Sequence, residues 1–92
     1  MNHVRLDFVN LGSMVFDVVV TSPGEAVAVA PAFKDSWPRE EQSSIEVASK
    51  DPTEPLVDSV IRIAYTTVLG ETRWDLYAVP KNGSTPQKLP KT

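Results

Sequence analysis

The chain contains no cysteine and a single histidine, and these two shortages exclude several kinds of chemistry. Without thiols there can be no disulfide, no thiolate zinc site and no cysteine nucleophile. His3 lies two residues from the start of the sequence, where strands fray and side chains are hydrated, and a general base also needs a nucleophile and an orienting partner. We therefore expect an ordinary exposed histidine and no catalytic residue.

Glycine-rich loops and long apolar runs are also missing. The four glycines, at positions 12, 24, 70 and 83, each stand alone, so no loop of this chain is suited to cradle a phosphate group. No apolar run approaches the roughly 18 residues that cross a bilayer, and residues 1–11 alternate charge with hydrophobe instead of forming an apolar signal core. These features predict a cytoplasmic protein with no membrane association and no cofactor.

The length and the charge distribution show what the chain has instead. Its 92 residues suffice for one core, and 41% apolar with 23% charged residues is ordinary for a globular protein. The net charge of −3 is uneven, because all twelve acidic residues precede Pro80 together with six basic ones, whereas the tail carries Lys81, Lys88 and Lys91 and no acid. The body of the chain is therefore −6, which disfavours binding to phosphate backbones.

Alternating apolar residues predict three strands in the first third of the chain. They cover residues 3–9, 14–20 and 26–30, and turn-forming residues separate them. A three-residue loop after the first strand and a proline-glycine turn after the second keep the apolar faces together, so consecutive strands pair as a β-meander over residues 3–30. In this register Asp7 lies opposite Asp17 on the outer face of the sheet.

The rest of the chain contains one long loop and one clear hairpin. Residues 31–44 have two prolines and no period, which predicts a loop with at most one short helical turn near residues 38–42, and residues 45–50 form a short strand. The hairpin covers residues 57–79, with Gly70-Glu71 as a two-residue turn. Residues 1–79 are thus expected to be a single β domain, and residues 80–92 a basic tail that is flexible or adds one short strand.

Together these elements predict an all-β fold. Five to six antiparallel strands form a small sandwich or a partly open barrel.

The last hairpin and the tail contain Ile63-Ala64-Tyr65, Trp74-Asp75-Leu76-Tyr77-Ala78-Val79, Asn82-Gly83 and Lys88-Leu89. Together these residues resemble one blade of a TolB-type β-propeller. The likeness covers about a third of the chain, and a propeller needs several such blades. The resemblance implies that the tail continues the sheet, and it implies no function.

Surfaces are the best guide to function in this sequence. The outer face of the predicted meander is more apolar than a solvated sheet requires, and either the second half of the chain or a partner covers it. Exposed aromatic residues serve as anchors at protein interfaces. Tyr77 is expected on the outer face of the hairpin, together with Arg62 and Arg73. The candidate contacts for a protein partner are Val15, Val19, Trp37, Arg62, Arg73 and Tyr77.

These surfaces predict a non-enzymatic protein-interaction module, such as an adaptor, an inhibitor or an assembly subunit, that binds a protein partner or a second copy of itself. One alternative is a single-stranded nucleic-acid binder, in which Tyr77, Tyr65 or Trp37 stacks on bases. Another alternative is a metal-dependent hydrolase in which Asp7 and Asp17 hold a hard cation.

Overall fold

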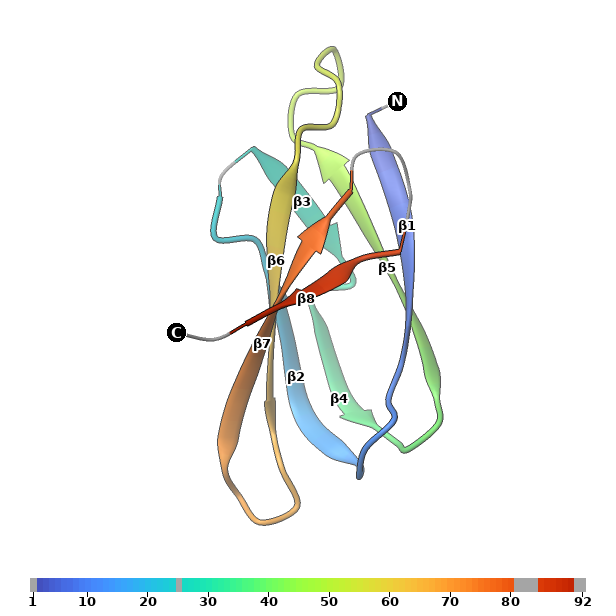
Figure 1. Ribbon diagram of the computed structural model, residues 1–92, viewed down its shortest axis with the longest axis vertical. Coiled ribbons are helices and arrows are strands. Elements are labelled where there is room, and N and C mark those ends of the chain that lie inside the picture. The colour runs from blue at the N-terminus through green and yellow to red at the C-terminus, as the bar shows by residue number, and fades with distance from the viewer. Residues whose placement is uncertain (1, 25, 81–84, 91–92) are drawn as a thin grey trace.

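The computed structural model describes residues 2–24, 26–80 and 85–90. Within these residues all regular secondary structure is β, and eight strands form two antiparallel sheets that face each other as a small sandwich (Figure 1). The described part of the chain has no helix that is long and apolar enough to span a membrane. The predicted all-β class is confirmed, and neither sheet closes into a barrel.

The smaller sheet has the order β1-β5-β3. Its strands are β1 (His3–Val9), β5 (Gln42–Ser49) and β3 (Val27–Ala30). β1 pairs with β5 along its whole length. The side chains at positions 4, 6 and 8 of β1 are buried and the others are exposed, as the period of two in the sequence predicts.

The larger sheet has the order β4-β2-β6-β7-β8. Its strands are β4 (Phe33–Trp37), β2 (Val15–Thr21), β6 (Ser59–Thr66), β7 (Thr72–Val79) and β8 (Gln87–Leu89). The short strand β8 pairs with β7, with Leu89 opposite Leu76, so the tail adds a strand to the sheet as the propeller-like pattern implied. The Asn82-Gly83 pair of that pattern lies outside the described residues.

The predicted β-meander is wrong. β1, β3 and β5 belong to the smaller sheet, whereas β2, β4 and β6 belong to the larger one, so the first six strands alternate between the sheets. An alternating pattern shows that one face of a strand is buried, but it gives the same signal whether the next strand pairs beside it or packs across the core. The turns at residues 10–13 and 22–24 therefore cross between the sheets.

The segment predicted as a long loop contains a strand. β4 lies within residues 31–44, and β5 begins at Gln42, three residues before the strand expected at 45–50. No helical turn forms at residues 38–42, because the chain makes a tight turn there, in which Glu41 N donates to Pro38 O (3.2 Å) and Glu40 has a positive φ of 68°. β4 was missed because its polar residues at the sheet edge show no period of two.

The hairpin of β6 and β7 exists as predicted, but its register differs. Thr67 O accepts a hydrogen bond from Gly70 N (2.9 Å), Thr67 N donates to Glu71 O (2.8 Å), and Gly70 has a φ of 82°. The loop therefore has three residues with glycine in the left-handed position, instead of two residues. Tyr65 lies opposite Arg73, whereas a two-residue turn at Gly70-Glu71 would place it opposite Leu76.

This register reverses the faces that the sequence suggested for β7. Tyr77 lies opposite the buried Ile61 on the inner face, whereas Trp74 lies opposite Ala64 on the outer face. The rings of Phe8 and Tyr77 make an edge-to-face contact with their centroids 5.0 Å apart, and this contact joins the two sheets. Tyr77 is thus an inward-facing residue that packs against the core.

Side chains from both sheets form one hydrophobic core. Its buried members are Val4, Leu6, Phe8, Val18, Val20, Val27, Trp37, Ile45, Val47, Leu56, Ile61, Ile63 and Val79. Trp37, which the sequence placed in an exposed loop, is only 8% exposed at the end of β4. Its indole Nε1 donates to Glu41 O (2.8 Å), so its polar atom is satisfied within the fold.

Candidate functional site

A β-bulge in β2 determines which of its side chains face outward. The register of β2 against β6 shifts between Phe16 and Val19, and Asp17 between them has a φ of 50°. An extra residue in a strand reverses the alternation beyond it. Val15 therefore packs against the core together with Val18, whereas Phe16 joins Val19 on the outside.

The outer side of the larger sheet carries a continuous apolar surface. One row of residues directly opposite one another runs across four strands, from Phe33 through Val19 and Ala64 to Trp74. We call the surface formed by this row and its apolar neighbours the outer face; its members are Phe16, Val19, Phe33, Ala64, Trp74 and Leu76.

Large apolar side chains of the outer face are exposed to solvent. Phe33 is 53% exposed, Val19 40% and Phe16 37%. The Arg62 guanidinium lies 5.1 Å from the centroid of the Trp74 ring, which places a cation over an aromatic residue of the outer face.

The residues proposed from the sequence as partner contacts do not gather on one surface. Val19 and Arg62 lie on the side of the larger sheet that is turned away from the core, and both are exposed. Val15 packs against the core, while Trp37 and Tyr77 are inward-facing.

Arg73 is exposed on the inner side of the hairpin, where its Nη2 lies 2.9 Å from Glu71 Oε2. Sequence reasoning missed Phe16, Phe33 and Trp74 as outward-facing residues. A strict period of two would place Phe16 and Trp74 in the core, and a bulge or an odd-length loop leaves no clear signal in the sequence.

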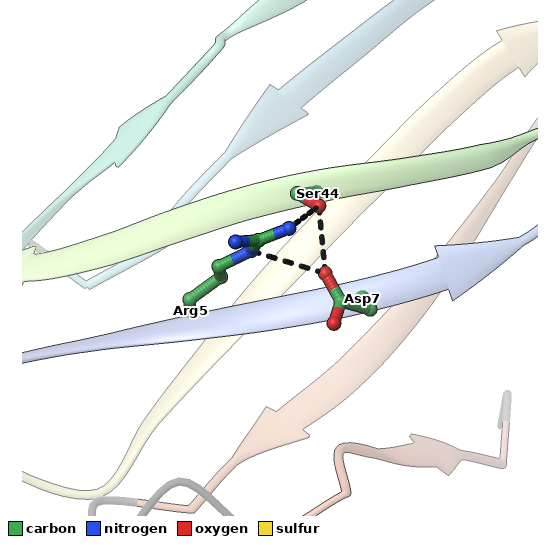
Figure 2. Close-up of polar contacts among 3 residues, drawn as sticks. All are labelled: Arg5, Asp7 and Ser44. Carbon is green, nitrogen blue, oxygen red and sulfur yellow. Dashed lines mark hydrogen bonds and ion pairs between the residues drawn. The ribbon is translucent and has the colours of Figure 1, made fainter.

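The proposed aspartate pair does not form. Asp7 lies in β1 of the smaller sheet, and Asp17 lies at the bulge in the larger one. Figure 2 shows Asp7 with its actual partners: its Oδ1 accepts from Ser44 Oγ (2.6 Å) and from Arg5 Nε (3.3 Å). The hydrogen bond from Ser44, followed by the charge of Arg5, lowers the pKa of Asp7. Among the described residues no group of three or more carboxylates and histidines is arranged to hold a metal ion.

A groove of about 600 Å³ opens on the inner side of the hairpin. One wall is the connection between β1 and β2, with the exposed Leu11 and Met14. The tip of the hairpin contributes Val68 and Leu69. The inward-facing residues of β6 and β7 also line the groove, and they include Tyr65, Asp75 and Tyr77. We call this cavity the inner groove.

The wall made by the β1–β2 connection is held by Asn10. Its Nδ2 donates to Ser13 O (3.0 Å) and to Trp37 O (2.8 Å), and its Oδ1 accepts from Gly12 N (3.0 Å). Its backbone N donates to Glu41 O (3.2 Å). These bonds join the connection to the end of β4, so the groove is preformed.

A carboxylate lies on the floor of the inner groove. The side chain of Asp75 is only 12% exposed, and its Oδ1 lies 3.4 Å from Lys88 Nζ. The Tyr65 hydroxyl donates to Asp75 Oδ2 (3.1 Å). Burial, and then the negative charge of Asp75, raise the pKa of both Tyr65 and Tyr77, so these hydroxyls are protonated at neutral pH.

Comparison of the chain with protein-family models, with curated proteins and with solved structures finds no match. The likeness of the last hairpin to a propeller blade therefore stays local.

Proposed function

We propose that this protein is a non-enzymatic interaction module that binds a protein partner through the outer face. The observation that carries the proposal is the run of apolar side chains across four strands, with Phe33 53% and Val19 40% exposed. In an antiparallel sandwich the side of a sheet turned away from the core usually carries polar residues. Exposed apolar patches on monomeric proteins mark interaction sites.

The chemistry of the outer face supports a protein partner. Interfaces are enriched in aromatic residues and arginine and depleted of other charged residues at their centre. The outer face has this composition, with Arg62 above Trp74 and with Phe33 and Phe16 on the neighbouring strands β4 and β2. The two phenylalanines would be the anchors, since both are exposed and neither belongs to the buried core.

Single-stranded nucleic acid is the second candidate ligand for the same surface. Phe16, Phe33 and Trp74 offer rings on which bases stack, and Arg62 supplies a positive charge. The net charge of −3 opposes this candidate, because backbone binding needs several basic residues in one place. A protein partner therefore accounts for the surface better.

The test uses Phe33→Glu, which puts a charge on the outer face at an exposed position. Val57→Glu is the matched control, because Val57 is 48% exposed in the connection before β6 and is not part of the outer face. We expect both variants to keep the wild-type circular dichroism spectrum and melting temperature. We further expect affinity capture from the native host to yield a partner with the wild type and with Val57→Glu, but not with Phe33→Glu.

Two further measurements separate the candidate ligands. Light scattering on the purified protein shows whether the partner is a second copy of the chain, in which case Phe33→Glu lowers the mass. Binding of labelled oligonucleotides that weakens steeply as salt rises would support nucleic acid instead. Equal capture by the wild type and Phe33→Glu would refute the outer face as the binding surface.

A further inference from the structure

The inner groove combines a nearly buried carboxylate with apolar and aromatic walls. Asp75 is 12% exposed at the floor and accepts a hydrogen bond from Tyr65. A carboxylate that is largely removed from water is stabilised by hydrogen bonds and by a neighbouring cation. Tyrosine rings also attract cations through their faces, and Tyr65 and Tyr77 both line the groove. The floor therefore favours positive charge.

The chain already supplies such a cation. The Nζ atom of Lys88 lies 3.4 Å from Asp75 Oδ1, although the side chain of Lys88 is 62% exposed. Holding this position costs the lysine rotamer freedom, and its exposed ammonium stays hydrated whether it lies at Asp75 or in solvent. Lys88 also belongs to β8, a strand of three residues at the edge of the sheet. Its ammonium is thus readily exchanged for another.

Four charged residues line the inner groove in the part of the chain that the structure describes. Two are acids and two are bases, and Arg73 is already bonded to Glu71 (2.9 Å). If Lys88 swings out into solvent, Asp75 leaves a net charge of −1 among these four residues. A cation is then favoured over a neutral or anionic molecule of the same shape.

From these observations we propose that the inner groove binds an organic ammonium ion with an apolar body. The ammonium group takes the place of the Lys88 Nζ atom at Asp75, and the apolar body lies against Leu11, Met14 and the hairpin tip. The volume of about 600 Å³ lies in the range of small-molecule sites, which is roughly 300–1,000 Å³. The wall fixed by Asn10 gives the ligand a preformed surface.

This site is independent of the proposed partner surface. Asp75 and Trp74 are neighbours in β7, and their side chains lie on opposite sides of the sheet. A ligand in the inner groove thus leaves the outer face uncovered, and failure of one proposal does not affect the other.

The experiment compares three probes of similar size: phenethylamine, the neutral phenethyl alcohol and the anionic phenylacetate. Binding is measured by calorimetric titration and by changes in backbone amide chemical shifts. We expect saturable binding of phenethylamine, with shifts at residues 10–14 and in β7, and binding of the other two weaker by about tenfold or more. Added salt weakens the binding of the amine.

Two substitutions and one control make the test specific. Asp75→Asn weakens binding of phenethylamine by about tenfold or more, whereas Asp7→Asn, in the other sheet, leaves it unchanged. Lys88→Met strengthens binding by about twofold to tenfold, because a ligand that competes with an internal group binds better once that group is removed. Lys88 is an exposed edge residue, so this variant folds even if Asp75→Asn does not.

The direction of the Lys88→Met effect decides the proposal. Unchanged or weaker binding of phenethylamine by Lys88→Met would overturn the exchange of cations. Equal binding of phenethylamine and phenethyl alcohol would overturn the role of Asp75. Chemical-shift changes confined to the outer face would show that phenethylamine binds there and not in the inner groove, which would also overturn the proposal.

Discussion

Replacing Trp37 by alanine is the strongest test of the core. The indole is 8% exposed and packs among buried residues of both sheets. Removing a buried tryptophan side chain costs about 3–5 kcal/mol, since apolar burial is lost and a cavity remains. The expected total stability of a chain this size is roughly 5–14 kcal/mol, so Trp37→Ala should remove a large fraction of it.

A phenylalanine at position 37 separates packing from hydrogen bonding. It keeps most of the apolar contact but removes the bond from Nε1 to Glu41 O (2.8 Å). That carbonyl still accepts from the backbone N of Asn10 (3.2 Å), so it is not left without a partner. The cost of Trp37→Phe should therefore be about 1–2 kcal/mol, with about 1 kcal/mol from the bond and the rest from lost volume.

Urea unfolding followed by circular dichroism measures both values, and Trp74→Phe is the control. Trp74 lies on the outer face, so we expect this control to cost no more than about 1 kcal/mol. The control also leaves Trp37 as the one tryptophan, since the chain has two, and its native fluorescence should be blue-shifted. A loss under about 1 kcal/mol for Trp37→Ala, or water-like emission from Trp37, would show that Trp37 is exposed.

Three further predictions follow from local geometry and charge. Gly70→Ala should cost about 1 kcal/mol in urea unfolding, because φ is 82° there and no atom within 4 Å would obstruct the added methyl group. The pKa of both tyrosines is raised from 10.0, so the tyrosinate absorbance of the folded protein should rise only above pH 10. The stability that the protonated tyrosines contribute below that pH is lost as pH rises through their folded pKa values. The pKa of Asp7 is lowered from 3.8, so the stability that its carboxylate contributes is present above that pH and is lost as pH falls through the folded value. The melting temperature of Asp7→Asn should therefore depend less on pH in this acid range than that of the wild type.

The sequence predicts where strands lie better than what they pair with. Val4, Leu6 and Phe8 are all buried, as their spacing indicates. That spacing does not show to which sheet β1 belongs. A strand with one buried face has the same pattern whether the next strand pairs beside it or lies in the opposite sheet. β5, the true neighbour of β1, begins 33 residues after β1 ends, and no local pattern reports such a long-range pairing.

For the tail, the sequence left two possibilities open, a flexible segment or one short added strand, and a short strand forms there. β8 follows β7 closely, and consecutive antiparallel strands joined by short turns usually pair with each other. The apolar Leu89 lies directly opposite Leu76, which fixes the register of a strand with only three residues. In contrast, β4 comes from a segment with two flanking prolines and mixed charge, and tertiary pairing with β2 determines its conformation.

Both candidate sites depend on changes of register that composition does not reveal. The bulge at Asp17 moves Phe16 outward, and the three-residue loop of the hairpin places Trp74 outward and Asp75 inward. With the predicted two-residue turn, Trp74 would join the core and Asp75 would face solvent, so neither an apolar outer face nor a carboxylate-floored groove would exist. Because side chains alternate with a period of two, one residue more or less in a loop exchanges the two sides of a strand. The surfaces of this protein are therefore determined by Asp17 and Gly70 as much as by the side chains that compose them.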